Sequence, residues 1–173
     1  MSLDTPLPTP KFDKPVKVLI AVSNEVPDVT STLSKGAIDA LEALGIGWDR
    51  IDVPRLSELG PAIGIAERMS NFDGYIVLGA AEVRGTVASD VALREAHHAL
   101  TLLGLQGLCV GHSVIAVDAK VDGAQEYENK GRQAVDAALH LIALSRKWGA
   151  QRKGIGFKPS LEDYQIASGG TTA

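Results

Sequence analysis

The stretch Val16-Lys-Val-Leu-Ile-Ala-Val22 decides the fold, because it is a run of apolar and β-branched residues interrupted by a single lysine. Such a run is typical of a strand that is buried on both faces of a sheet. It ends at the polar residues Ser23, Asn24 and Glu25, which predict a loop. The sequence therefore predicts a buried strand over residues 16–22.

A helix is expected directly after this loop. Asp28, Thr30 and Ser31 offer oxygen atoms that can cap its N-terminus. Apolar residues then recur at steps of three and four, the spacing of one helix face, and Gly45 is expected to end the helix as a C-cap. The apolar residues on this face are Val29, Leu33, Ala37, Leu41 and Leu44.

The alternation of strand and helix repeats along the rest of the chain. Further strands are predicted at 48–53, at 75–79 and from 108–110 toward Val117, and further helices at about 58–69, 87–103 and 123–148. Strands that alternate with helices imply right-handed crossovers and a parallel sheet with helices on both faces. The expected fold class is α/β, a three-layer α-β-α sandwich around a four-stranded parallel sheet.

Two terminal segments lack this alternation. Residues 1–15 hold four of the eight prolines and are expected to form an extended N-terminal arm. Residues 151–173 become rich in Gly, Ser and Thr, so we expect a flexible C-terminal tail or an arm on a neighbouring subunit. The predicted domain spans 16–150, and one domain is usual for a chain of 173 residues.

Composition narrows the class of function. The 17 Lys and Arg residues against 21 Asp and Glu residues give a net charge of −4, and no basic patch predicts nucleic-acid binding. No stretch approaches the roughly 18 apolar residues that span a membrane, and the N-terminus lacks an apolar signal region. Cys109 is the single cysteine and lies in an apolar run, so we expect a buried thiol. A cytoplasmic protein without nucleic-acid or membrane partners is the expectation.

Ligands of parallel α/β sheets bind at the loops beyond the carboxyl ends of the strands. The third of these loops holds Arg84, Gly85 and Thr86 before a helix, a run that can offer a guanidinium, backbone N–H groups and a hydroxyl to an anion. Glu58 and Glu82 place carboxylates in two of the loops. The four expected loops are 23–28, 54–60, 79–89 and 111–121.

The histidines are candidates for metal binding or proton transfer. His97 and His98 are adjacent on a predicted helix, where their side chains point about 100° apart and do not readily hold one metal together. We therefore predict no metal site. The pair His112-Ser113 lacks the second flanking glycine that exposes a nucleophilic serine, so we interpret His112 as a residue that lines a binding cleft.

Three stretches outside the loops make the chain resemble a known family. They are 12–20 (Phe-Asp-Lys-Pro-Val-Lys-Val-Leu-Ile), 66–75 (Ala-Glu-Arg-Met-Ser-Asn-Phe-Asp-Gly-Tyr) and 139–147 (Leu-His-Leu-Ile-Ala-Leu-Ser-Arg-Lys). They resemble the lumazine synthases of alphaproteobacteria, and the resemblance covers about 12–150. It implies the flavodoxin-like lumazine synthase fold and a homopentamer, decamer or icosahedral shell with the site between subunits.

The resemblance also implies a reaction. The family condenses 5-amino-6-(D-ribitylamino)uracil with 3,4-dihydroxy-2-butanone 4-phosphate in riboflavin biosynthesis, by positioning and proton transfer and without a cofactor. The family places an aromatic ring after its first strand, where this chain has Asn24 or Glu25. The family's second loop, Pro-Gly-Ala-Phe/Leu-Glu-Ile-Pro, is Pro54-Arg-Leu-Ser-Glu-Leu-Gly60 here, which keeps the glutamate as Glu58.

The third and fourth loops differ from the family as well. The family reads Ile-Arg-Gly-Glu-Thr-x-His, and its histidine moves protons. Residues 83–89 read Val-Arg-Gly-Thr-Val-Ala-Ser, so the histidine position is Ala88, or Ser89 if no residue is deleted. The family's Asn/Phe-Gly-Ile-Leu-Thr becomes His112-Ser-Val-Ile-Ala116, while Asn129-Lys-Gly131 matches the family's Asn/Asp-Lys-Gly.

Two hypotheses follow from the changed loops. The first is a lumazine synthase of reduced activity, in which Glu58 and Thr86 hold substrates and His112 or water moves protons. The second is a paralogue without synthase activity, which forms an assembly or binds another small flavin-like or phosphorylated ligand. His112 is the catalytic candidate. The substrate-binding candidates are Asn24, Glu25, Ser57, Glu58, Leu59, Ala81, Glu82, Arg84, Gly85, Thr86, His112, Ser113 and Lys130.

Overall fold

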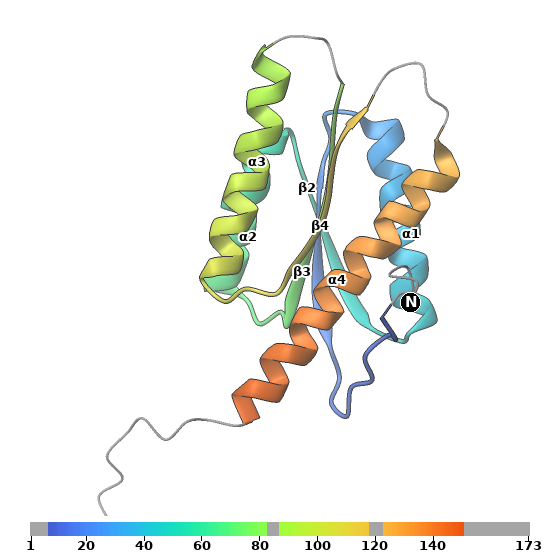
Figure 1. Cartoon of the computed structure of the whole chain (residues 1–173), viewed down its shortest axis with the longest axis vertical. Coiled ribbons are helices and arrows are strands. Elements are labelled where there is room, and N and C mark those ends of the chain that lie inside the picture. Colours follow the sequence, from blue (N-terminus) through green and yellow to red (C-terminus); the bar gives the residue numbers. More distant parts are fainter. Residues whose placement is uncertain (1–6, 83–86, 118–122, 151–173) are drawn as a thin grey trace, which may run out of the picture.

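The computed structural model describes residues 7–82, 87–117 and 123–150, and Figure 1 shows a sheet between two layers of helices. The predicted alternation of strands and helices is confirmed. The elements in chain order are β1 (Lys17–Ser23), α1 (Pro27–Ala43), β2 (Gly47–Val53), the 3₁₀ helix η1 (Leu56–Glu58), α2 (Leu59–Met69), β3 (Gly74–Glu82), α3 (Val87–Leu105), β4 (Val110–Val117) and α4 (Ala124–Ala150).

The sheet has four strands in the order β2-β1-β3-β4, and all of its pairings are parallel. β1 pairs with β2 on one side and with β3 on the other. Every residue of β1 after Lys17 is buried, which confirms that this apolar stretch forms the centre of the fold. The predicted α/β three-layer sandwich with a parallel, flavodoxin-like sheet is therefore correct.

Each face of the sheet carries its own core. Successive residues of a strand point to opposite faces, so Ile20 packs under α1 and α4 while Leu19 packs under α2 and α3. Figure 1 shows these two helix pairs on opposite sides of the sheet. Leu33 and Leu139 fill the first core, and each is fully buried. Burying a leucine completely contributes about 1.5–3 kcal/mol, so these apolar positions hold the layers together.

The start of α1 differs from the prediction, but its end does not. Val26 precedes the helix, and no side chain caps it. Pro27 occupies the first turn, where its fixed φ suits a helix and its missing N–H needs no partner. The Thr30 hydroxyl donates a hydrogen bond to the Val26 carbonyl oxygen at 3.2 Å instead of capping the helix. Gly45 has a φ of 66°, as expected for a glycine that ends a helix.

β3 and β4 extend further than the predicted loop boundaries. β3 runs to Glu82, so Ala81 and Glu82 are strand residues instead of loop residues. The expected loop at 111–121 is wrong over 111–117, which belong to β4 and confirm the predicted run of this strand toward Val117. Pairing between the two strands is continuous from Tyr75 to Glu82, and this pairing keeps His112 and Ser113 inside a strand.

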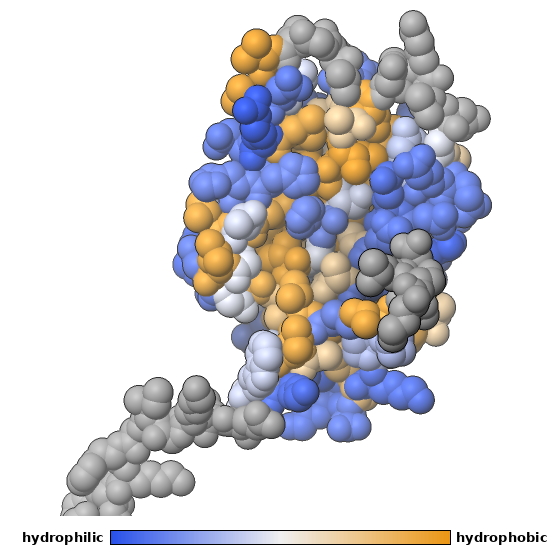
Figure 2. Space-filling model, viewed as in Figure 1, coloured by the Kyte–Doolittle hydropathy of each residue, from blue (hydrophilic) through white to orange (hydrophobic). Residues whose placement is uncertain are grey.

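The face around β4 is rich in apolar side chains. β4 is an edge strand, so one side of it has no neighbouring strand within the described chain. Figure 2 shows apolar residues gathered along the middle of this face, between the helices that flank β4. Exposed large apolar side chains on these helices are Val87, Val91, Leu102 and Leu105 of α3 and Leu141, Leu144 and Trp148 of α4.

The segments at the two ends of the domain are described only in part. Residues 7–16 contain neither helix nor strand, whereas 1–6 and the predicted tail at 151–173 lie outside the described residues. Cys109 is buried, as predicted, and burial raises the pKa of its thiol. No helix within the described ranges is long and apolar enough to cross a membrane.

Candidate active site

A cavity of about 290 Å³ lies at the carboxyl edge of the sheet. It is formed where the loop after β1, the end of β3 and the first turns of α3 meet. The predicted site residues Glu25, Ala81 and Glu82 line it together, and so does Ala88. Sequence reasoning missed Val26 and Ala92 as lining residues, because small apolar side chains carry no chemical signal.

The charge of this cavity favours some ligand groups over others. Glu25 and Glu82 bring two carboxylates to it, and its other described lining residues are apolar except for Ser89. Carboxylates accept hydrogen bonds and attract cations, so this part of the cavity suits amino and hydroxyl groups. The predicted anion-binding run Arg84, Gly85 and Thr86 lies outside the described residues.

The second loop is organised by its own glutamate. The Arg55 backbone N–H donates a hydrogen bond to Glu58 Oε2 at 2.8 Å, and the Ser57 hydroxyl donates one to Glu58 Oε1 at 2.7 Å. The Leu56 N–H lies 3.4 Å from Glu25 Oε2 and links this loop to the first. The Asn24 N–H also links the two loops, because it donates a hydrogen bond to the carbonyl oxygen of Val53, the last residue of β2, at 2.8 Å. The Glu58 carboxylate thus shapes the loop, and substrate contact by Ser57 and Glu58 stays a prediction.

Leu59 is placed under the site instead of in it. Its side chain is fully buried in the core beneath α2 and α3. A Cβ atom at Gly79 would lie 2.5 Å from Leu56 Cδ2 and 3.2 Å from Leu59 Cδ1, so both leucines press against bare backbone. The adjacent Ser23 hydroxyl is buried and has no hydrogen-bond partner within the described chain. Any ligand contact with Leu59 is therefore expected to come from its backbone.

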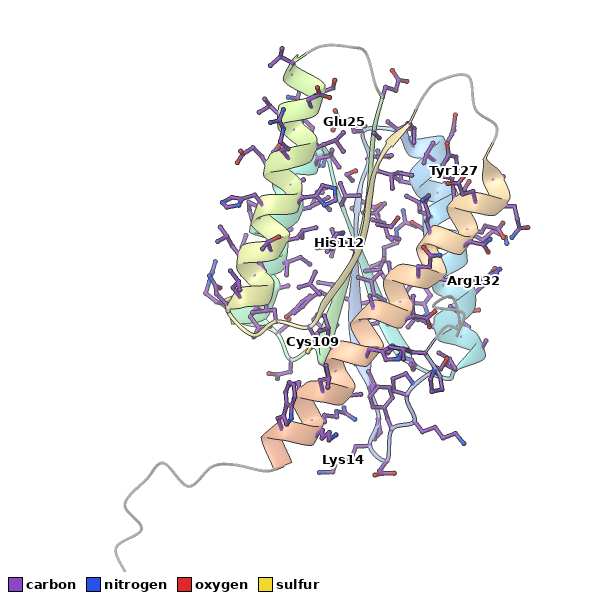
Figure 3. The ribbon with its side chains drawn as sticks, viewed as in Figure 1. Lys14, Glu25, Cys109, His112, Tyr127 and Arg132 are labelled. Carbon is purple, nitrogen blue, oxygen red and sulfur yellow. The ribbon has the colours of Figure 1, made fainter. Side chains whose placement is uncertain are left out.

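His112 lies away from this cavity. It pairs with Val77 in the middle of β3, whereas Val117 pairs with Glu82 at the cavity. Five residues along the strand separate His112 from the position of Val117, a distance of about 17 Å. Figure 3 shows Glu25 at the end of the sheet and His112 well along β4. Ser113 is buried, and no described contact brings it to the cavity.

The His112 ring has a neighbour that the sequence did not predict. The imidazole of His97, on α3, lies edge to face with it at 5.3 Å between ring centroids. His112 counts as an exposed residue, yet its partial burial against α3 lowers the pKa of the imidazole, and the charge of His97 lowers this pKa further. A lowered pKa favours the neutral form, which can accept a proton.

Lys130 lies on α4, in the other helix layer. Its Nζ atom is 3.4 Å from Glu126 Oε1, one helical turn earlier. The structure therefore does not bring Lys130 to the cavity of its own chain. Within the described ranges, no three His, Cys, Asp or Glu residues are grouped so that they could hold a metal ion.

Comparison with known proteins agrees with this architecture. The family model described as 6,7-dimethyl-8-ribityllumazine synthase matches residues 15–146. The 6,7-dimethyl-8-ribityllumazine synthase of Jannaschia sp. strain CCS1 is 42% identical over 98% of this chain and 97% of its own length. The protein of that name from Bartonella tribocorum is 32% identical, over 78% of this chain and 93% of its own. Rhizobium meliloti 6,7-dimethyl-8-ribityllumazine synthase 1 is 31% identical, over 80% and 97%. The chain belongs to the 6,7-dimethyl-8-ribityllumazine synthase family.

Proposed function

We propose that this chain condenses 5-amino-6-(D-ribitylamino)uracil with 3,4-dihydroxy-2-butanone 4-phosphate, releasing phosphate and water, in riboflavin biosynthesis. The observation that carries the proposal is the 42% identity to the Jannaschia synthase, which extends over almost the whole of both chains. The reaction needs no cofactor, because imine formation and ring closure require only that the substrates are positioned and that protons are moved. Family membership also supports the expected cytoplasmic location.

The described cavity suits the uracil substrate. The amino groups and ribityl hydroxyls of this substrate are hydrogen-bond donors, and the Glu25 and Glu82 carboxylates are acceptors at the cavity wall. Asn24 or Glu25 stands where the family has a stacking ring, so polar contacts replace stacking in this proposal. The phosphate of the second substrate is assigned to Arg84, Gly85 and Thr86, because carboxylates repel it.

Proton transfer is the step that the altered site makes slower. Ala88 has no group that can exchange a proton, and loss of such a group typically costs about 10²–10⁴-fold in rate. We assign the transfer to His112 of a neighbouring subunit. Within one chain His112 is about 17 Å from the cavity level, whereas it is exposed on the edge strand, where a second subunit can meet it.

The proposed assembly is a homopentamer or a multiple of it, with the site between subunits. Support comes from the edge strand β4 and from the exposed apolar residues on α3 and α4 beside it. Contiguous exposed apolar surface and open strand edges usually mark a protein interface. Light scattering on the purified protein tests this, since a species of 18.2 kDa would contradict any assembly.

A second candidate function is favoured by one observation. Ala88 lines the cavity. If it holds the family's histidine position, as the alignment with a deleted residue has it, that position is compatible with ligand binding but not with proton transfer. In this case the chain is a catalytically inactive paralogue that binds a flavin-like or phosphorylated ligand.

One experiment separates the two functions. Purified protein is mixed with both substrates, and the lumazine absorbance is followed against a protein-free control. Turnover above the control that falls when His112 is replaced by glutamine supports the synthase. Turnover equal to the control, together with quenching of riboflavin fluorescence by the protein, supports the second function.

A further inference from the structure

We propose that His97 is a positioning residue, which sets the orientation and the charge state of the His112 imidazole through the edge-to-face contact between their rings. The inference rests on the proposed synthase function, in which His112 moves protons. It goes further because it gives a role to a residue on a different element, for which the chain's loops give no indication.

The contact gives His112 a fixed partner. His97 projects from α3 onto the α3-facing side of β4, and the ring centroids are 5.3 Å apart with an interplanar angle of 64°. Edge-to-face pairs at this distance are favourable and limit ring rotation. The neighbours of His112 on the sheet are apolar: Val77 is paired with it on β3, and Val110 and Val114 precede and follow it on the same face of β4.

The surroundings also set the charge of the pair. Two imidazolium groups at this separation repel each other, and the apolar neighbours from β3 and β4 provide no charge that relieves the repulsion. The causes that lower the pKa of His112 are burial first and the charge of His97 second. At a given pH, His112 is therefore neutral in a larger fraction of molecules than an isolated histidine is.

A neutral, oriented imidazole can do what the residue at position 88 cannot. During imine formation the attacking amine gives up two protons in turn. The carbonyl oxygen takes them up, first as the carbinolamine hydroxyl and then as the water that leaves. His112 accepts each proton from the nitrogen and passes it to the oxygen, so it ends the step unchanged. His97 contributes by keeping His112 ready to accept the proton.

The test combines NMR titration with kinetics on the full-length assembled protein. The variant is His97→Gln, which removes the ring and its charge. The matched control is His98→Gln, because His98 is adjacent on the same helix but exposed and without a contact to His112 within the described chain. Isotope-labelled histidine reports the titration midpoint of each of the four imidazoles, and kcat and KM are measured across pH.

The expected result is specific to one variant. In His97→Gln the titration midpoint of His112 rises toward its ordinary value. The acid limb of the kcat profile moves to higher pH by the same amount, and KM is unchanged. At a fixed pH on that limb, kcat falls about tenfold for each unit by which the His112 midpoint rises. His98→Gln leaves both the His112 midpoint and the limb in place. A merely structural role for His97 would lower kcat without moving the limb.

Two outcomes overturn the proposal and differ from failure of the synthase function. The first is a His112 midpoint that is the same in wild type and His97→Gln, while the wild type still makes lumazine. The second is a midpoint that shifts while the kcat profile stays in place. A wild-type protein that makes no lumazine refutes the synthase function, and the proton-transfer role of the pair fails with it.

Discussion

Arg146 Nη2 donates a hydrogen bond to Asp73 Oδ1 at 2.9 Å, which joins the end of α4 to the turn before β3. The other Asp73 oxygen accepts a hydrogen bond from the Lys17 N–H, also at 2.9 Å, at the start of β1. The same guanidinium donates to the carbonyl oxygens of Lys14 and Pro15, each at 2.9 Å. One side chain therefore fixes the segment that leads into the central strand.

Replacing Arg146 with alanine is expected to destabilise the fold by about 1–2 kcal/mol. Hydrogen bonds to charged groups contribute about 1.5–3 kcal/mol, and partial exposure of this ion pair reduces the loss. Urea unfolding measures it. Lys147→Ala is the control, because Lys147 is exposed and has no ion pair within the described ranges. Equal losses in the two variants would show that the contacts of Arg146 contribute nothing.

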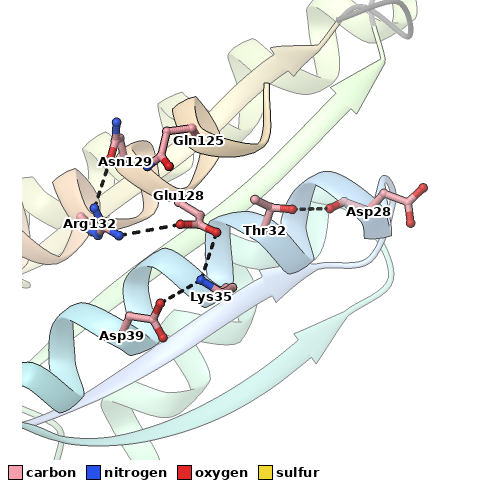
Figure 4. Close-up of polar contacts among 8 residues, drawn as sticks. All are labelled: Asp28, Thr32, Lys35, Asp39, Gln125, Glu128, Asn129 and Arg132. Atoms are coloured by element: carbon pink, nitrogen blue, oxygen red, sulfur yellow. Dashed lines mark hydrogen bonds and ion pairs between the residues drawn. The ribbon is translucent and has the colours of Figure 1, made fainter. Parts of the chain in front are cut away.

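The crossing of α1 and α4 depends on glycines. A Cβ atom at Gly131 would lie 2.0 Å from the Leu33 carbonyl oxygen, and one at Gly36 would lie 2.0 Å from the Glu128 carbonyl oxygen. Beside them, Lys35 Nζ lies 3.0 Å from Glu128 Oε1 and 3.1 Å from an Asp39 oxygen (Figure 4). Hydrogen bonds to these carboxylates raise the pKa of Lys35. The Asn129-Lys-Gly131 motif thus serves close helix packing.

Gly131→Ala is expected to cost about 3 kcal/mol, because the added methyl group forces two backbones apart in a packed interior. Thermal or urea unfolding gives the value. Gly104→Ala is the matched control: a Cβ atom there meets nothing within 4 Å. It should gain about 0.5–1 kcal/mol from helix propensity. If Gly131→Ala is as stable as the wild type, the helices do not cross this closely.

Much of the fold was predictable because strand and helix periods are local properties of the sequence. The run at 16–22 and the helix face from Val29 to Leu44 needed no knowledge of partners. The predicted run of the fourth strand toward Val117 matches the end of β4, but the end of β3 was not predictable in this way. Polar residues such as His112 and Glu82 are typical of loops, and only their pairing with a neighbouring strand makes them strand residues. Strand length is set by that partner.

The place of the candidate site was predictable from the sequence, but the contacts of its side chains were not. The rule that ligands meet the carboxyl ends of parallel strands brings Glu25 and Glu82 together, and the cavity between them agrees with it. The contact between His97 and His112 depends on the position of α3 along β4, and the periodicity of the sequence does not determine that position. The sequence predicts that the Glu58 carboxylate binds a ligand, but the hydrogen bonds that it accepts within the loop depend on the folded backbone.

Placing a histidine at position 88, where the resemblance to the family puts its proton-transferring residue, provides a gain-of-function prediction. Ala88 lines the cavity in the first turn of α3, so Ala88→His places an imidazole there. We expect kcat to rise about 10²-fold, the lower limit of the usual contribution of general acid–base catalysis. Lumazine formation measures the rate. Ser89→His is the control, because Ser89 holds the histidine position if no residue of the family's third loop is deleted in this chain. A larger gain at Ser89 would move the histidine position by one residue.

The final prediction concerns the pH dependence of stability. The pKa of His112 is lowered from an unfolded value of 6.5, so between the lowered pKa and 6.5 the unfolded chain binds more protons than the folded one. Stability therefore falls as the pH drops through this window, and the loss is complete below the folded pKa. The free energy of unfolding in urea, at one protein concentration, is measured at pH 7.5 and at several lower values. His112→Gln should flatten this decline. His140→Gln should keep the wild-type slope, because His140 contacts the Asp136 carbonyl oxygen on α4, away from His97. If His112→Gln declines as steeply as the wild type, another group causes the acid sensitivity.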